Sequence, residues 1–413
     1  MAVKVVAVRS QVLDLQESAL NEAGFKVGEV VKVTGAGVFD DEERLLPLIS
    51  WYISHGVRNA TLSLDSAETY GKNLGYCHEY LNGRREFQGL VRDEAFLDVG
   101  TYVLEEYFAQ LRNEDELSSK TIRNRDAALQ SFFEKHLCRS IDDSPPLRTA
   151  SSPYPYGLLS PSPKRSLVVA CALEDLKQLI LSTRSERERC LLQFIFDTGV
   201  RRSEVPRVTL AAIDAALSFQ NAQFVSRGGN DAIQADYCPL LIHGSKGRGG
   251  ESKERYTIVS RATLQRVKKY HASPLYKMYS RQFQSPETTP AFLNANGGAY
   301  KPNSISKLLE RVSNRALAKL KIKKAISPHK LRHGNAYAIL RSPDLGNDYL
   351  DRMVIVQKSL GHNHLSTSEM YTQIPQDIYQ QLCRPDASTK TKAGEMEELV
   401  QQTRLKFSLG DTK

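Results

Sequence analysis

The sequence lacks any long apolar run, which argues against a membrane-spanning helix. None of its runs approaches the ~18 consecutive apolar residues that a membrane span needs, and the stretch at residues 167–173 is far shorter. Residues 1–15 contain no long apolar stretch and no small-residue cleavage site. We therefore expect neither a membrane span nor a signal peptide.

Cysteine is also scarce, and no two cysteines form a recognisable motif. The six cysteines are scattered through 413 residues without a CxxC pair. In a chain of this length that pattern is typical of reduced, buried thiols in a cytosolic protein. We therefore expect a cytoplasmic location.

The composition is otherwise ordinary, but the positive charge is concentrated in one segment. With 41% hydrophobic and 25% charged residues, the sequence is not that of a mostly disordered chain. The formal net charge is +9, and residues 301–332 hold ten Lys or Arg against one acid, Glu310. The rest of the chain is therefore close to neutral. Charge this concentrated favours a face that binds a polyanion, with a merely solubilising face as the alternative.

Proline marks the clearest boundary in the chain. Residues 145–163 hold six of the 17 prolines. Because proline fixes φ and removes a backbone donor, this stretch should form neither a helix nor a central strand. We interpret residues 141–166 as an extended linker between two domains. A long surface loop inside one domain is the alternative.

On the N-terminal side of this linker, apolar residues recur at helical spacing. Residues 66–81, 96–111 and 119–137 each place apolar side chains three and four apart, which predicts amphipathic helices. Residues 41–140 are therefore predicted to form a small helical domain. We assign no role to residues 1–40, although their valine-rich part, residues 27–33, suggests a strand. The last helix has a basic flank that either faces solvent or contacts phosphates: Lys120, Arg123 and Arg125.

The C-terminal side mixes helices with a β-hairpin. Helical patterns occur at residues 173–181, 186–196 and 304–320. Residues 237–243 and 255–259 are β-like runs around a glycine-rich stretch, which predicts a hairpin. The predicted fold class is therefore mainly α with a small β-hairpin, an α+β arrangement.

Two basic residues lie in turns from which their side chains can project. Arg201 follows the turn in DTGVRRSE, residues 197–204, where one helix ends and another is expected to begin near Ser203. A salt bridge to Glu204 is the alternative to a role in a cleft. Lys246 lies in the glycine-rich turn of the hairpin, where it either reaches into the groove of a partner or stays in solvent.

Histidine, arginine and tyrosine form two further motifs. In PHKLRH, His329 and Arg332 are three residues apart and share a face of a helix, whereas His333 is expected to point elsewhere. An imidazole beside a guanidinium suits phosphoryl transfer, because one handles a proton and the other binds non-bridging oxygens. In LGHNHLSTSEMYT, Tyr371 follows His362 by nine residues.

The clustered histidines raise a competing interpretation. The spacings H-x3-H and H-x-H, formed by His329, His333, His362 and His364, are compatible with a zinc site. However, no cysteine or acidic motif accompanies them, and nearby arginine and lysine side chains repel a dication. We therefore predict no metal and no other cofactor.

In this order, the motifs resemble those of the tyrosine recombinase (phage integrase) family. The match spans residues 173–379 and consists of TGVRRSE, the hairpin lysine of GSKGRGG, PHKLRH and LGHNHLSTSEMYT. Pro206 departs from the pattern, because the family usually continues a helix there. The resemblance implies a helical core-binding domain over residues 41–140 and a catalytic domain over residues 167–385. Together these domains are expected to form a C-shaped clamp around double-stranded DNA.

The resemblance implies that DNA is cut by a tyrosine. Tyr371 attacks the phosphodiester and forms a 3′-phosphotyrosyl intermediate that stores the bond energy, so religation needs no ATP. Arg201 and Arg332 hold the non-bridging oxygens of the pentacoordinate state.

Three more residues complete the expected set. His329 assists proton transfer around the tyrosine, and His362 forms a hydrogen bond with the phosphate. Lys246 protonates the 5′-hydroxyl leaving group.

Three functions share these features. A recombinase exchanges strands between two sites and assembles as a tetramer on DNA. This is the function we favour, with a mobile element as its expected context. A type IB topoisomerase cuts and reseals one strand, and a catalytically silent DNA-binding protein does neither. Residues 386–413 form a tail whose helical part, residues 395–407, either contacts a neighbouring protomer or packs on its own domain.

Overall fold

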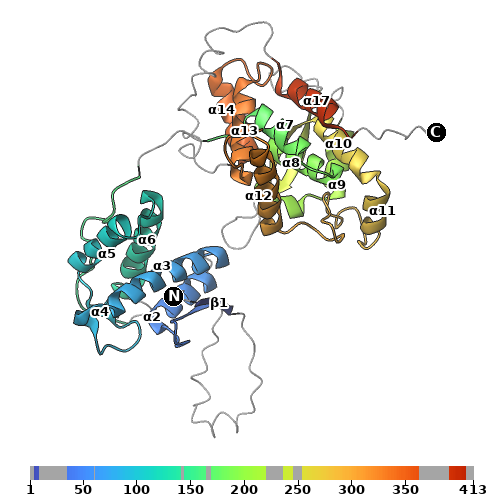
Figure 1. Ribbon diagram of the computed structural model, residues 1–413. Helices are drawn as coiled ribbons and strands as arrows, with labels where there is room; N and C mark the ends of the chain where they lie inside the picture. The colour runs from blue at the N-terminus through green and yellow to red at the C-terminus, as the bar shows by residue number, and fades with distance from the viewer. Residues whose placement is uncertain are drawn as a thin grey trace, which may run out of the picture. The chain divides into compact units, whose positions relative to one another are not determined.

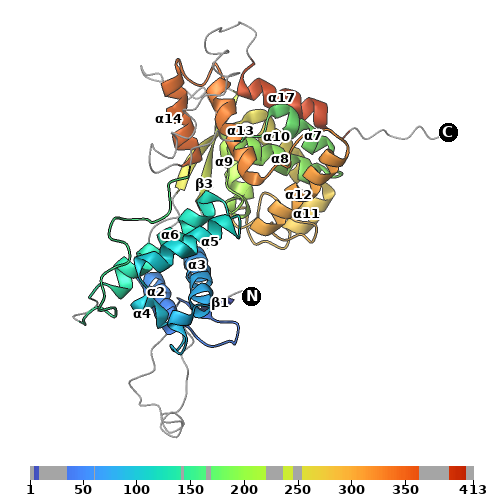
Figure 2. The same ribbon diagram turned by 60° about the vertical axis from the view of Figure 1, so that its left-hand side comes forward.

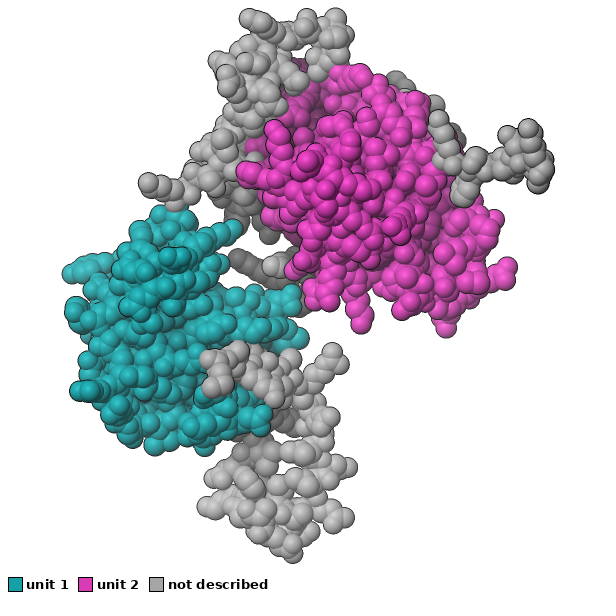
Figure 3. Space-filling view, viewed as in Figure 1, with its two compact units in different colours: residues 1–165, 248–250 teal, residues 166–247, 251–413 magenta. Residues whose placement is uncertain are grey.

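The chain folds as two units (Figure 3). Each unit has its own buried apolar core. The computed structural model describes residues 4–8, 35–59, 61–140, 144–163, 169–219, 236–244, 254–361 and 390–405. Unit 1 comprises residues 1–165 with 248–250, and unit 2 comprises residues 166–247 with 251–413. None of the helices in these described ranges is long and apolar enough to cross a membrane.

The described residues of unit 1 form a helical bundle with one small sheet. Strands β1 (Lys4–Val8) and β2 (Gly35–Phe39) pair antiparallel. The helices, labelled in Figure 1, are α2 (Pro47–Arg58), α3 (Leu64–Asn82), α4 (Ala95–Asp98), α5 (Thr101–Asn113) and α6 (Ser119–Phe132). A 3-10 turn at Arg85–Phe87 and a π turn at Phe133–Leu137 complete the unit. The strand suggested for residues 27–33 lies outside the described residues.

The helix predicted for residues 96–111 is in fact two helices. α4 ends at Asp98, and α5 begins after Gly100, whose backbone is extended at φ −93° and ψ 170°. Phe96 and Leu104, on either side of this break, are both buried in the core of unit 1. The apolar spacing therefore continues across the break, and only the glycine marks it in the sequence.

The basic flank of α6 is largely used inside unit 1. The Arg125 guanidinium lies 4.2 Å from the centre of the Tyr76 ring and donates a hydrogen bond to the Tyr107 hydroxyl at 3.3 Å. Arg123 donates to the carbonyl of Ser160. These internal partners favour a structural role for both arginines over phosphate contacts.

The proline-rich segment packs against unit 1 and is not a free spacer. The buried Arg148 guanidinium donates to the carbonyls of Phe96, Leu97 and Val99 at 2.9, 2.7 and 2.8 Å. Tyr154 is buried in the core of the unit. The segment forms neither helix nor strand, as its prolines predict. Over the described residues 144–163 it matches the alternative to the linker interpretation of residues 141–166, a surface loop inside one domain. The two units divide after residue 165.

The described residues of unit 2 form helices around one antiparallel hairpin. Strands β3 (Tyr237–His243) and β4 (Glu254–Ser260) pair so that Leu240 lies opposite Thr257. Its helices are α7 (Leu173–Leu181), α8 (Glu186–Thr198), α9 (Leu210–Ser218), α10 (Arg261–His271), α11 (Pro274–Ser280), α12 (Pro302–Ala318), α13 (Pro328–Arg341), α14 (Tyr349–Leu360) and α17 (Lys392–Thr403). The predicted mainly α fold with a small hairpin is confirmed.

Helix α8 is the centre of unit 2. It packs against α7, α10 and α13, as Figures 1 and 2 show, and nearly all of its side chains are buried. The Ser185 hydroxyl caps its N-terminus by accepting a hydrogen bond from the Glu188 amide. Because α8 is held on all sides, the residues that follow its C-terminus start from a fixed point.

Helix α17 packs on the unit that carries it. Met396 and Leu399 are buried in the core of unit 2 beside residues of α8 and α10. The helical tail predicted at residues 395–407 is therefore present, with bounds shifted toward the N-terminus. Its packing corresponds to the alternative in which the helix docks on its own domain.

Candidate active site

The turn after α8 brings Arg201 to the surface of unit 2. Gly199 ends the helix with φ +63°, a left-handed conformation that glycine adopts without strain. A Cβ atom at this position would lie 2.6 Å from Leu360 Cδ2 and 2.9 Å from Asn335 Oδ1. Only glycine therefore lets the ends of α8 and α14 approach so closely. The helix expected near Ser203 is absent: a turn leads instead to a 3-10 helix at Val205–Arg207, where proline is at the helix start.

Arg201 forms the salt bridge that the sequence offered as an alternative. Its backbone amide donates to Glu204 Oε2 at 2.7 Å, and its Nη1 donates to Glu204 Oε1 at 2.9 Å. The Arg201 side chain is still 34% exposed, whereas Glu204 is fully buried. The carboxylate therefore fixes the direction of the guanidinium while part of it stays accessible.

Glu204 also binds a second arginine, which the motif analysis missed. Arg255, on β4, donates to both carboxylate oxygens of Glu204 at 2.7 and 2.8 Å. Although burial raises the pKa of Glu204, the hydrogen bonds and charges of Arg255, with those of Arg201, lower it to about 2. Glu204 is thus an ionised anchor shared by two arginines.

Arg332 lies at the centre of the same region. It is only 2% exposed, and its guanidinium donates to the carbonyl of Gly199 at 2.5 Å and to the carbonyl of Leu360. These carbonyls belong to the ends of α8 and α14. Arg332 therefore joins the segment that precedes Arg201 to the first residue of the Leu-Gly-His motif.

His329 and His333 lie side by side on α13. Their ring centres are 4.7 Å apart, with the rings nearly perpendicular, because residues four apart share a face of a helix. The expectation that His333 points elsewhere is therefore wrong. His329 is exposed and His333 is buried. Within the described residues, no group of three potential metal ligands gathers; His362 and His364 of the zinc hypothesis lie outside them.

Three of the six predicted residues, Lys246, His362 and Tyr371, lie outside the described residues. The structure describes the chain on either side of them. Gly361 ends α14 at φ +64°, and a Cβ atom there would lie 2.6 Å from Arg255 Cδ. The Arg255 guanidinium also donates from Nε to the carbonyl of Ser359 at 2.9 Å. Arg255 thus links the end of α14 to Glu204, although no local motif marks it in the sequence.

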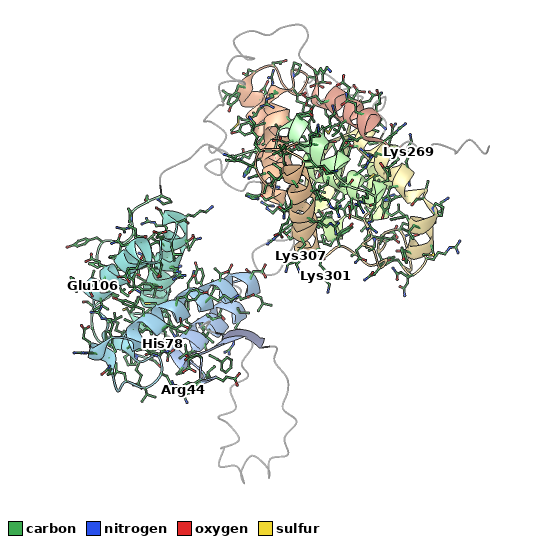
Figure 4. All side chains as sticks on the ribbon, viewed as in Figure 1. Arg44, His78, Glu106, Lys269, Lys301 and Lys307 are labelled. Atoms are coloured by element: carbon green, nitrogen blue, oxygen red, sulfur yellow. The ribbon has the colours of Figure 1, made fainter. Side chains whose placement is uncertain are left out.

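The basic segment at residues 301–332 begins on α12. Lys301 and Lys307 are both exposed at one end of this helix (Figure 4). Lys319, Lys321 and Lys323 are also exposed. The described part of this segment is therefore accessible to a polyanion, although Arg311 forms an ion pair with Glu188 at 2.6 Å.

Replacing Glu204 by glutamine is expected to destabilise unit 2 by about 3–5 kcal/mol near neutral pH, because Arg255 is left buried without its partner. The folded pKa of Glu204, about 2, is below its ordinary value of 4.5. The contribution of Glu204 to the free energy of unfolding is therefore fully present above about pH 4.5 and is lost as the pH falls through about 2.

Urea unfolding at pH 7 and pH 3 measures this effect. The stability gap between wild type and Glu204→Gln should narrow at pH 3. Glu310→Gln, at an exposed position on α12, is the matched control and should change little at either pH. A gap that stays constant with pH would show that the carboxylate charge is not what stabilises the fold.

Comparison with known proteins identifies the family. The model of the phage integrase family matches residues 171–377, just over half of the chain and a range that includes all six predicted site residues. The chain is 26% identical over 313 residues to tyrosine recombinase XerC of Anoxybacillus flavithermus, covering 75% of this chain and 86% of that protein. It is also 26% identical over 289 residues to an integrase/recombinase of Escherichia coli, covering 67% of this chain and 77% of that protein.

Solved structures show the same fold. The XerH site-specific recombinase bound to palindromic difH substrate, in a post-cleavage complex, is similar with a TM-score of 0.54 at 20% identity, covering 78% of this chain and 80% of that one. The Tn1549 transposon integrase in complex with transposon right-end DNA is similar with a TM-score of 0.52 at 14% identity, covering 83% and 99%. The chain therefore belongs to the phage integrase family, and it is a site-specific recombinase of the tyrosine type.

Proposed function

We propose that this recombinase cleaves and rejoins double-stranded DNA at a specific site through a 3′-phosphotyrosyl intermediate, and that it serves a mobile element. The observation that supports this most is that one turn, residues 199–201, contains one predicted arginine and is in contact with the other. Arg332 holds the carbonyl of Gly199, two residues before Arg201, and Glu204 fixes Arg201 itself. Guanidinium groups fixed in this way suit the charge that develops on the oxygens of a phosphate under attack.

The chemistry that we assign to the site needs no cofactor. The Tyr371 phenolate oxygen forms a bond to phosphorus, and the bond from phosphorus to the 5′ oxygen breaks. Lys246 gives its proton to that oxygen, His329 assists proton transfer around the tyrosine, and His362 donates to the phosphate. The reverse reaction, with a 5′-hydroxyl as nucleophile, rejoins the strand and frees the tyrosine.

The partners are part of the same proposal. The XerH recombinase and the Tn1549 integrase were solved with DNA, and the exposed lysines of residues 301–324 suit a phosphate backbone. We assign unit 1 the role of the core-binding domain and unit 2 that of the catalytic domain. The active assembly is a tetramer on DNA, located in the cytoplasm, and the integrase relatives favour a mobile element as its context.

Covalent trapping on DNA tests the proposed function. Sequencing the ends of the mobile DNA that flanks the gene supplies the candidate site. The purified protein is then incubated with a labelled duplex of that site, and products are separated on a denaturing gel. A gel-stable protein–DNA adduct and exchange between marked sites are expected. Adducts with relaxation of supercoils but no exchange would indicate a topoisomerase, and binding without adducts would indicate a silent DNA-binding protein.

Replacing Lys319, Lys321 and Lys323 together by glutamine is expected to weaken non-specific DNA binding at low salt. Each lysine that contacts a phosphate contributes roughly 0.9 to the slope of log affinity against log salt. The triple variant should therefore flatten the slope, measured by fluorescence anisotropy over a salt series. A control variant with glutamine at the exposed Lys269 and Lys277 should keep the wild-type slope. A triple variant with the wild-type slope would show that these lysines face solvent.

A further inference from the structure

Lys392, at the start of α17, is a fully buried lysine. Its Nζ lies 2.9 Å from Asp197 Oδ1, and it donates to the carbonyls of Asp197 and Ile258 at 2.8 and 3.1 Å. Both the lysine and the aspartate side chains are 0% exposed. Three acceptors match the three donors of an ammonium group, which is the condition under which a lysine charge can be buried.

The partner of this lysine lies in the last turn of α8. Asp197 accepts hydrogen bonds from the amide and hydroxyl of Ser260 at 2.9 and 3.1 Å, at the end of β4. Two residues after Asp197 comes Gly199, whose carbonyl binds Arg332. Asn335, on α13, also donates to the carbonyl of Asp197. The carboxylate is therefore built into the backbone segment that positions both predicted catalytic arginines.

The N-terminal end of α17 is fixed in unit 2. The Lys392 amide donates to the Ser342 hydroxyl at 2.8 Å, and the Ala393 amide donates to the Tyr237 hydroxyl at 3.0 Å. These bonds hold the first turn of α17 against α13 and β3. The position of Lys392 is thus set by the fold and not by the ion pair alone.

The C-terminal end of α17 is held as firmly. Arg189, on α8, donates to the carbonyl of Thr403 at 2.7 Å, and Arg266, on α10, donates to the Thr403 hydroxyl at 2.7 Å. Both arginines are buried. Because α17 is anchored at both ends, its Lys392 can hold the buried carboxylate of Asp197, on α8, in one place.

We propose that Lys392 is a positioning residue of the active site. By neutralising Asp197 it keeps the end of α8 in the conformation that presents Arg201 and binds Arg332. This inference rests on the proposed function, because its consequence is the rate of DNA cleavage. It differs from a purely stabilising role, which would change the folded fraction and leave the folded molecules fully active.

The test compares Lys392→Met with Lys390→Met. Lys390 lies two residues away and forms an exposed pair with Glu398 at 2.5 Å, so it is the matched control. Single-turnover adduct formation, DNA affinity and the unfolding midpoint are measured for each full-length variant. Well below its unfolding midpoint, Lys392→Met should form the adduct about 10- to 100-fold more slowly than wild type, while its DNA affinity stays within about twofold. Lys390→Met should match wild type in all three.

A second variant separates charge neutralisation from packing. In Asp197→Asn/Lys392→Met neither charge is buried, so this double variant should fold and regain most of the wild-type rate, even if Lys392→Met alone fails to fold. The inference is overturned if Lys392→Met cleaves at the wild-type rate, if its rate and affinity fall together with the folded fraction, or if the folded double variant stays slow. If wild type itself forms no adduct, it is the proposed function that fails.

Discussion

Replacing Tyr371 by phenylalanine is expected to abolish the covalent protein–DNA adduct and leave DNA affinity unchanged. The variant keeps the aromatic ring but loses the hydroxyl oxygen that we propose to attack phosphorus. Removal of a nucleophile typically costs about 10⁴-fold or more in rate. A denaturing gel measures the adduct, and fluorescence anisotropy measures DNA binding.

Tyr379→Phe is the matched control for this experiment. Tyr379 lies eight residues further along and does not follow a Leu-Gly-His motif at the spacing of nine that relates His362 to Tyr371. Its variant should form the adduct at the wild-type rate. If Tyr379→Phe abolishes the adduct while Tyr371→Phe retains it, the assignment of the nucleophile is wrong.

The elements with a regular apolar pattern were predictable from the sequence. The helix expected at residues 173–181 and the strand expected at residues 237–243 have those bounds in the structure. Both patterns arise because one face of each element is buried. The break at Gly100 escaped the same reasoning, because Phe96 and Leu104 keep facing one core on both sides of it.

The proline-rich segment shows what composition leaves undetermined. Proline predicts the absence of helix and strand, and residues 144–163 have neither. Proline content does not reveal whether an extended segment docks on a domain. Here docking depends on single side chains, such as Arg148, which satisfies three carbonyls left near the end of α4.

Long-range ion pairs account for what the sequence reading of the site missed. The salt bridge from Arg201 to Glu204 could be considered from the sequence alone, because the two residues are three apart. Arg255 binds the same carboxylate from 51 residues away, and Lys392 reaches Asp197 from 195 residues away. No spacing rule connects such pairs, so only the fold brings them together.

The last prediction concerns the proton donor. Replacing Lys246 by alanine is expected to slow cleavage of ordinary DNA by about 10²–10⁴-fold, because the 5′ alkoxide is a poor leaving group without a proton. A sulfur atom at the 5′-bridging position leaves readily as a thiolate and needs little help from an acid. Lys246→Ala should therefore cleave a 5′-thio substrate nearly as fast as wild type does.

Two further variants make the thio experiment decisive. Arg201→Ala should stay slow on both substrates, since the role that we propose for Arg201 is to stabilise charge on the non-bridging oxygens and not to protonate the leaving group. Lys253 is the other lysine of the glycine-rich turn, and it precedes Glu254, whose carboxylate lies 2.8 Å from His243 Nδ1 at the base of the hairpin. Lys253→Ala should cleave ordinary DNA at close to the wild-type rate. If Lys253→Ala is slow and the 5′-thio substrate rescues this variant instead of Lys246→Ala, the acid is on the other side of the turn. If the 5′-thio substrate rescues neither variant, a different residue protonates the 5′ oxygen.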